Sequence, residues 1–273
     1  MKKIVLFILL MLPVAVFGQK NVSQAKKEIQ NYTDSLSDDQ KEALFALTEE
    51  VFLISVDSLI ANGQYLDAVE LMDSIEYNWK YLTGYNPSER FYMTKTNTLQ
   101  YLEEWQKMVD TVIKYNELYR ENFRKDVAGL MYRMQGIAYY NLDQYVNSIK
   151  AYEKGMYYED KIENQAECYL SMGHCYAALG KHTLTAKFYK KGFDLYLKYF
   201  GTTRSAILRN NFYIQEKYKK LVLDCYASHL IKLAIYEQDY GTRQAMKEYL
   251  LMAAHCGSDF AKEEYERIFG RYY

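Results

Sequence analysis

The side chains with the most potential for chemistry are four cysteines and four histidines. Cys225 and His229 stand four residues apart, which places both on one face of a helix. His255 and Cys256 follow later in the chain, and these are ligand types that Zn²⁺ accepts. However, the sequence has no CxxC pair, and no other feature makes the four side chains converge. We therefore expect a structural role for these residues, with no metal and no other cofactor.

Two of the cysteines are also candidates for a disulfide. The turn near Gly241 lies about midway between Cys225 and Cys256, so two helices that fold back there would bring the sulfurs level. An exported protein would permit this bond. Cys168 and Cys175 are seven residues apart on one helix, about 10.5 Å of rise, and cannot pair. The alternative is that all four cysteines are small buried apolar residues.

Sequence motifs of common enzymes are missing. No nucleotide or phosphate loop of the GxxxxGK[ST] or GxGxxG type occurs, and neither a GxSxG nor an HExxH motif is present. Acidic pairs such as Glu103-Glu104 and Glu263-Glu264 have the spacing of solvated helix faces, and nothing selects a catalytic pair among them. We therefore expect that the chain is not an enzyme.

The composition excludes several other classes. Of the 273 residues 49% are hydrophobic and 30 are Tyr, which is incompatible with a disordered chain. Four cysteines are too few for a disulfide scaffold. A net charge of −1 argues against a nucleic-acid partner, which needs a basic surface. Only two prolines occur, whereas a β-sandwich or barrel of this size needs more of them in its turns.

The first 18 residues have the pattern of a cleaved signal peptide. Two lysines precede the apolar run Ile4–Phe17, and small Gly18 precedes Gln19. The run is shorter than the roughly 20 residues that span a bilayer, and no later stretch is apolar enough for a stable membrane span. No cysteine near Gly18 offers a lipid attachment point. We expect export to the periplasm or the extracellular space.

Helical hairpins are predicted from apolar periodicity. One apolar stripe covers residues 52–60 and a second covers 65–75, each with helical spacing. Gly63 lies between them at a position that suits a left-handed helix end. Two amphipathic helices joined by so short a turn must pack antiparallel.

The hairpin recurs along the chain. The segments Tyr132–Gly155 and Tyr169–Gly192 align without a gap. The alignment pairs small and aromatic residues, namely Tyr132 with Tyr169, Gly136 with Gly173, Tyr139 with Tyr176, Tyr152 with Tyr189 and Gly155 with Gly192. Self-similarity of this kind indicates a helical repeat array, in which each hairpin buries its apolar face against the next.

This pattern resembles the tetratricopeptide repeat (TPR). Four units match over about residues 49–200, with departures at His182 and Thr185. Their glycine-equivalent positions are Val56, Thr96, Gly136 and Gly173, at intervals of 40, 40 and 37 residues, against roughly 34 in the family. The helices or linkers must therefore be longer than usual. The resemblance implies an all-α fold, an α-solenoid of stacked antiparallel hairpins (a TPR-like superhelix) with about 10–12 helices. An irregular helical bundle is the alternative.

The segments outside the array are expected to be helical caps. Ser37 and Gln40 form a capping box, and Asn86 with Pro87 is expected to start a later helix. A turn is predicted over 239–242, and Gly257-Ser258 should end one helix and cap the last. The expected organisation is a signal peptide over 1–18, N-terminal capping helices over 19–48, the array over 49–200 and C-terminal capping helices over 201–273.

The resemblance also implies a binding groove. In the TPR family the first helix of each hairpin lines a concave groove that holds a peptide. Matching positions here are Asp57, Arg90, Asn97, Gln100, Arg133, Ile137, Tyr140, Leu170 and His174. Arg90, Arg133 and Tyr140 are the anchors of a type common in protein-binding sites. Most other tyrosines fall on register positions, where core packing explains them.

Three functions remain open. The first is an exported, non-enzymatic scaffold that binds a protein or peptide. The second is a glycan-binding accessory protein of a sugar-uptake system. The third is an assembly factor of the bacterial envelope. The sequence defines neither the partner nor the oligomeric state.

Overall fold

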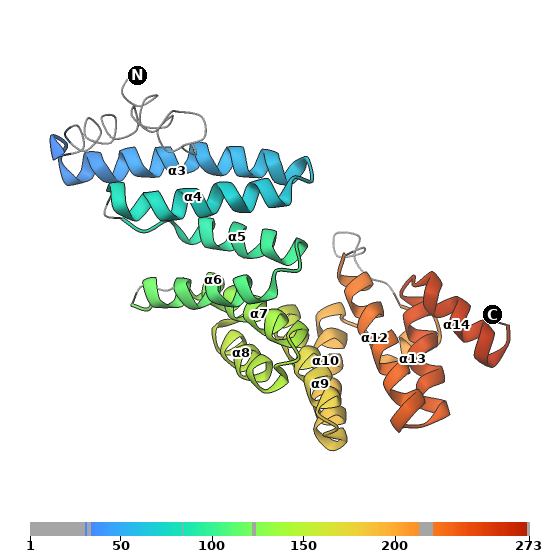
Figure 1. The fold of residues 1–273 in the computed structure, drawn as a ribbon. Helices are drawn as coiled ribbons and strands as arrows, with labels where there is room; N and C mark the ends of the chain where they lie inside the picture. The colour runs from blue at the N-terminus through green and yellow to red at the C-terminus, as the bar shows by residue number, and fades with distance from the viewer. Residues whose placement is uncertain (1–30, 32–33, 84, 122–123, 213–220, 272–273) are drawn as a thin grey trace. The chain divides into compact units, whose positions relative to one another are not determined.

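The chain folds into helices that form two compact units. A computed structural model describes residues 31, 34–83, 85–121, 124–212 and 221–271 (Figure 1). This part of the chain contains twelve helices and no strand, which confirms the predicted all-α class. The first unit ends at Leu142 and the second begins at Asp143. The predicted leader over 1–18 and most of the helix predicted over 22–35 lie outside the described residues.

The first unit stacks two hairpins and one further helix. Each helix packs against the next in sequence, and α5 also contacts α7. These helices run from blue to green in Figure 1. They are α3 (Asp38–Ala61), α4 (Tyr65–Thr83), α5 (Glu89–Tyr101), α6 (Trp105–Leu118) and α7 (Lys125–Asn141). Helix α3 crosses residue 49 without a break, so the expected cap and the first repeat share one helix.

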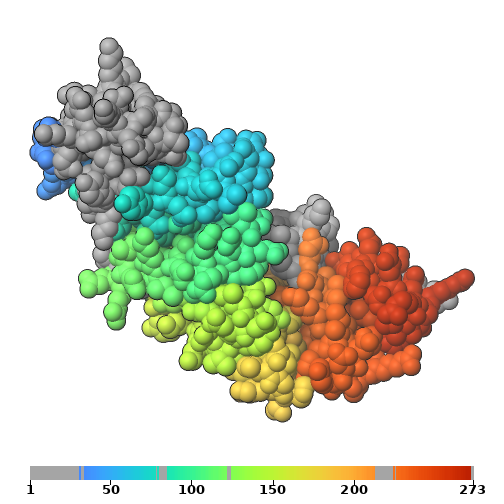
Figure 2. All heavy atoms as spheres, in the orientation of Figure 1, coloured from blue at the N-terminus to red at the C-terminus, as the bar shows by residue number. Residues whose placement is uncertain are grey.

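The second unit is built in the same way. Its helices are α8 (Tyr145–Tyr158), α9 (Ile162–Ala178), α10 (His182–Phe200), α11 (Arg204–Leu208), α12 (Leu221–Tyr240), α13 (Arg243–His255) and α14 (Asp259–Phe269). Helices α9 and α10 form the most extensive hairpin, and α12, α13 and α14 pack in succession. Figure 2 shows α13 and α14, in red, as one closely packed body.

The turn inside each hairpin has one repeated geometry. A three-residue turn joins α3 to α4, α5 to α6, α7 to α8 and α9 to α10. The middle residue is left-handed each time, with φ of 74° at Gly63, 56° at Glu103, 58° at Asp143 and 68° at Gly180. Glycine adopts this conformation without strain, whereas the backbone of Glu or Asp is strained in it. The turn at Gly63 confirms the prediction, and the other turns show that backbone geometry is repeated more faithfully than sequence.

The long repeat intervals arise between the hairpins. Helices α3, α5, α7 and α9 each end five residues after the glycine-equivalent position. The length of this segment is therefore constant. The two 40-residue intervals contain linkers over 84–88 and 119–124, whereas the 37-residue interval has a shorter linker over 159–161. Helix α4, with 19 residues, adds further length. Long linkers and helices therefore explain the departure from the usual repeat length, as predicted.

Small residues allow close helix contact in the α9–α10 hairpin. A Cβ atom placed on Gly173 would come within 2.4 Å of the Tyr189 ring, and one on Gly192 within 2.6 Å of the Leu170 side chain. Real Cβ atoms do not tolerate such distances. Both glycines therefore let the two helices approach each other closely.

Helix caps follow the sequence with one exception. Ser37 Oγ accepts from the backbone N–H of Gln40, and the Gln40 side chain accepts from Ser37 N–H, so the capping box is confirmed. Asn86 does not cap α5. Ser88 does, by accepting from Phe91 N–H at 3.3 Å. The prediction is wrong because the Ser88 N–H is itself held by Glu49 Oε1 at 2.7 Å, a contact from α3 that fixes where the helix begins.

The C-terminal turns agree with the sequence. Helix α12 ends at Tyr240, and Thr242 caps α13 by accepting from Ala245 N–H. Ser258 caps α14 in the same manner, one residue after left-handed Gly257. Before these helices, α11 stops at Leu208, and a turn follows at Asn210.

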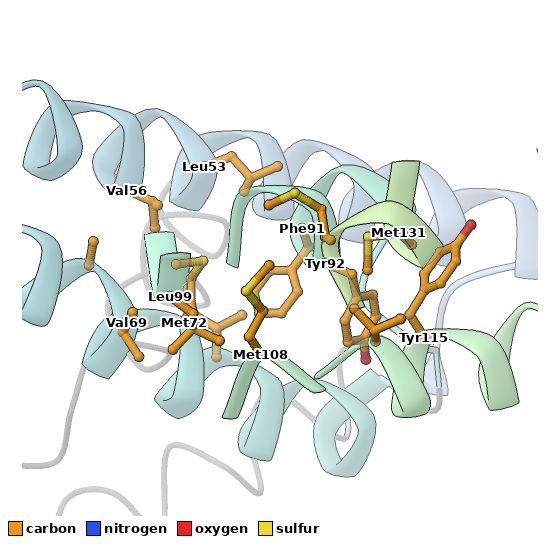
Figure 3. Close-up of a cluster of buried hydrophobic side chains, with 14 of the residues drawn as sticks. Leu53, Val56, Val69, Met72, Phe91, Tyr92, Leu99, Met108, Tyr115 and Met131 are labelled. Atoms are coloured by element: carbon orange, nitrogen blue, oxygen red, sulfur yellow. The ribbon is translucent and has the colours of Figure 1, made fainter. Parts of the chain in front are cut away.

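Each unit has its own hydrophobic core. In the first, aliphatic and sulfur-containing side chains from α3 to α7 meet around Val56, Tyr92 and Met108 (Figure 3). The expected register position Thr96 is buried there, and its hydroxyl donates to the Tyr92 carbonyl at 2.7 Å. The second core also contains many aromatic rings. It includes Tyr189, Phe193, Tyr196, Phe200 and Tyr226.

Candidate peptide-binding groove

A cavity opens between α3, α5 and the start of α6 in the first unit. Its volume is about 690 Å³. Three of the residues predicted to line a groove, Asp57, Asn97 and Gln100, line this cavity. Its other lining residues are Ile60, Thr94, Thr98, Tyr101, Glu103 and Trp105.

The repeat geometry explains why these residues meet. Val56 and Thr96 occupy equivalent small-residue positions and are buried. The next residue on each helix, Asp57 or Asn97, is turned about 100° around the axis and is exposed. Because α3 and α5 are the first helices of consecutive hairpins, both side chains reach the same side of the hairpins, and Gln100 lies one turn beyond Asn97.

Two of the predicted groove residues bind each other. Arg90 on α5 donates from Nη2 to Asp57 Oδ2 on α3 at 3.1 Å, and from Nη1 to the Glu50 carboxylate at 2.8 Å. The Glu50 hydrogen bond is the main cause that raises the pKa of Arg90, and Asp57 adds to it. The three side chains are about half exposed. Each of the two ion pairs therefore contributes at most about 1 kcal/mol to stability. Arg90 does not line the cavity itself.

An aromatic surface borders the cavity. Tyr101, the last residue of α5, is 68% exposed. Its ring stacks on Tyr65 with centroids 4.9 Å apart and an interplanar angle of 13°. Tyr101 and Trp105 both line the cavity. Sequence reasoning missed Tyr101, although it lies outside the repeat register, which is the criterion that selected Tyr140.

The predicted residues on α7 do not join this cavity. Ile137 is partly buried against the first core. Arg133 is half-buried, and Tyr140 is 36% exposed at the surface. Helix α7 nevertheless contacts α5, so these side chains belong to the same unit as the cavity.

Two predicted groove residues belong to the interior of the second unit. Leu170 is fully buried in the second core, where it packs on Gly192. The prediction that Leu170 lines a groove is therefore wrong, because the close approach of α10 covers this side of α9. The two ring nitrogens of His174 form hydrogen bonds with Tyr189 at 2.5 Å and with His229 at 3.0 Å. The ring is therefore held inside the second unit.

A buried ionic cluster in the first unit was not predicted. Lys95 is only 8% exposed at its side chain and pairs with Asp73 at 2.6 Å and Glu76 at 2.5 Å. Lys114 also binds Glu76, at 2.7 Å. Burial favours the neutral form of Glu76, but the two lysines outweigh it and lower the pKa of its carboxyl. These charges compensate one another, as buried ions must.

The cysteines and histidines show no metal arrangement. Within the described residues no group of three or more His, Cys, Asp or Glu side chains is placed to hold a metal ion. Cys256 is a buried free thiol, and burial raises its pKa to about 12. Because Cys256 is a free thiol, the disulfide predicted between Cys225 and Cys256 is not present in the structure. In the described part, no helix is long and apolar enough for a membrane span.

Comparisons with known proteins support the fold. No protein-family model and no curated protein matches the sequence. The crystal structure of MamA protein is similar, with a TM-score of 0.52 and 12% identity over 82% of this chain and 97% of that one. The apo form of RapI has a TM-score of 0.43 and 15% identity, over 94% and 97% of the two chains. The likeness to MamA shows a TPR-like fold of stacked helical hairpins. No comparison favours the glycan-binding alternative.

Proposed function

We propose that the chain is a non-enzymatic scaffold that holds a segment of a protein partner in the cavity between α3 and α5. The observation that carries this proposal is the placement of Asp57, Asn97 and Gln100 around one open cavity of about 690 Å³. A cavity of this size accommodates a few residues of an extended chain.

The lining chemistry fits a peptide. The amides of Asn97 and Gln100 supply both donors and acceptors, which match the N–H and C=O groups of an extended backbone. Tyr101 and Trp105 supply ring surface for an apolar side chain. Carboxylates predominate among the charges, because Asp57 and Glu103 line the cavity whereas Arg90 is neutralised by its own partners. We therefore expect a segment with a basic residue.

Affinity capture tests the proposal. The chain without residues 1–18 is used as bait against a library of displayed peptides, and enriched sequences are synthesised and titrated by calorimetry. We expect the double substitution Asn97→Ala/Gln100→Ala to weaken binding at least about tenfold, since two hydrogen-bonding side chains are lost. Gln64→Ala/Gln106→Ala is the matched control, because these amides are exposed and do not line the cavity. Equal loss in both variants, or loss in neither, contradicts the proposal.

The proposed site of action is outside the cytoplasm, in the periplasm or the extracellular space. The apolar leader that ends at Gly18 supports this. N-terminal sequencing of the protein from its native cells should give a chain that begins at Gln19. An intact N-terminus in the cytoplasmic fraction would contradict export without affecting the binding proposal.

A further inference from the structure

A second cavity lies entirely within the second unit. Its volume is about 360 Å³, and helices α10 to α13 form its walls. Aromatic rings provide much of the lining, namely Tyr189, Phe193, Tyr226, Tyr236 and Tyr249. The volume is near the lower end of the range for ligand sites, which suits one aromatic ring with a short chain.

One wall carries a hydroxyl without a partner. Tyr226 is fully buried, and its ring meets Phe193 and Phe200 edge-on at 5.5 and 5.4 Å. Its hydroxyl has no hydrogen-bond partner among the described residues. A buried O–H group normally has one, because it loses water without compensation otherwise. Since Tyr226 lines the cavity, an acceptor on a bound molecule is the natural partner.

Arg204 lines the same cavity and supplies a cation there. Burial raises the pKa of Tyr226, and the Arg204 charge acts in the opposite direction, as expected for neighbouring groups. The Arg204 guanidinium lies 5.2 Å from the centre of the Tyr249 ring, which is also part of the wall. It donates from Nη2 to Glu248 at 2.6 Å, and a guanidinium carries five N–H donors in all. Glu248 also accepts from Gln244 at 2.9 Å, so it keeps a partner when Arg204 is shared.

The acidic residues at the cavity are less suited to hold a ligand. Glu237 accepts from the backbone N–H of Thr242 at 3.0 Å and is thereby committed to the start of α13. Asp194 and Lys190 are exposed and of opposite charge. The donors on the cavity side, Tyr226 and Arg204, therefore decide which charge is preferred.

We propose that this cavity binds an aromatic carboxylate, with the ring among the tyrosines and the carboxylate accepting hydrogen bonds from Tyr226 and Arg204. Two sources share this chemistry: a free aromatic acid, and the C-terminal residue of a peptide. The site is distinct from the α3–α5 cavity and goes beyond the proposed scaffold function.

A titration followed by NMR or calorimetry tests the inference with three probes. These are 3-phenylpropionate, its neutral amide 3-phenylpropanamide, and the tripeptide acetyl-Gly-Gly-Phe with a free carboxylate. We expect both acids to bind and the amide to bind at least about tenfold more weakly, because only the acids offer a charged acceptor. Tighter binding of phenylpropionate than of the tripeptide would indicate a free acid, and the reverse order a peptide C-terminus.

Tyr226→Phe is the decisive variant, because it removes the hydroxyl and keeps the ring. It should weaken the acids about tenfold, leave the amide unchanged and leave thermal stability equal or higher, since an unsatisfied buried group is removed. Arg204→Gln should reduce the preference for the acid in the same way. Tyr176→Phe, a partly buried tyrosine outside the cavity, is the matched control and should bind normally.

Three results would overturn the inference: no binding of either acid, equal affinity for acid and amide, or an unchanged affinity in Tyr226→Phe. The groove variant Asn97→Ala/Gln100→Ala should bind all three probes like the wild type. Failure of one proposal is therefore distinguishable from failure of the other.

Discussion

Gly173 on α9 faces the ring of Tyr189 on α10 so closely that a Cβ atom at the glycine would lie 2.4 Å from the ring carbon Cδ1. Tyr189 is buried, and its hydroxyl also binds His174. The ring therefore has little freedom to move away. This contact joins the two helices of the hairpin and makes the glycine a packing requirement.

Gly173→Ala should lower the free energy of unfolding by about 1–3 kcal/mol, the usual cost of overpacking a core. Urea unfolding measures the change. The matched test is a double-mutant cycle with Tyr189→Leu, whose smaller side chain leaves room for the new methyl group. The alanine should then cost clearly less. An equal cost in both backgrounds would show that the ring does not cause the effect.

At two equivalent turn positions, removing a glycine and introducing one should change stability in opposite directions. Gly180 and Glu103 are both left-handed, with φ of 68° and 56°. Gly180 has open space around its Cα, so Gly180→Ala should cost about 1 kcal/mol from backbone strain alone. Glu103→Gly should be neutral or stabilising by up to about 1 kcal/mol, since it relieves that strain. A neutral Gly180→Ala in thermal unfolding would argue against this explanation.

The buried carboxyl of Glu49 should make the stability of the protein depend on pH. Burial raises the pKa of its carboxyl above the ordinary 4.5, although the Ser88 N–H opposes this. The folded state therefore binds a proton more readily than the unfolded chain, and the charged form costs stability above the folded pKa. Glu49→Gln keeps an acceptor for Ser88, so it should stabilise the protein at pH 7 and lose this advantage toward pH 4. Exposed Glu42→Gln, the control, should show no such trend; the same trend there would contradict the prediction.

His174 should make stability depend on pH in the opposite direction, with a loss as the pH falls. Burial, together with the charges of His229 and Lys232, lowers its pKa well below 6.5. The unfolded chain then binds the proton more readily, so stability present above pH 6.5 is lost progressively as the pH falls below that value. The His229 side chain in turn binds Glu167 at 3.0 Å.

Chemical unfolding at pH 7.5 and pH 5 measures this loss. His174→Gln should reduce the difference in unfolding free energy between the two pH values, because the buried titrating group is gone. His182→Gln, which changes an exposed histidine, should retain the wild-type difference. If His174→Gln behaves like the wild type, another group controls the acid sensitivity.

Local features of the fold were predictable from the sequence because they depend on residues near one another in the chain. The capping box of Ser37 and Gln40 and the turn at Gly63 each need only a few neighbouring residues. The failed cap at Asn86 shows the limit, since Glu49, 39 residues away from Ser88, decides where that helix starts.

The surfaces around the two cavities show the same division. The sequence by itself determined the hairpins and their register, and it predicted that Asp57, Asn97 and Gln100 lie on one side of them, because a repeat places equivalent residues on equivalent faces. Only the tertiary structure decided that Leu170 is covered by α10, that Lys95 is buried among carboxylates, and that Tyr226 lines a cavity with an unpaired hydroxyl. These properties depend on which helices pack together across long sequence distances, and helical periodicity specifies a buried face without specifying what covers it.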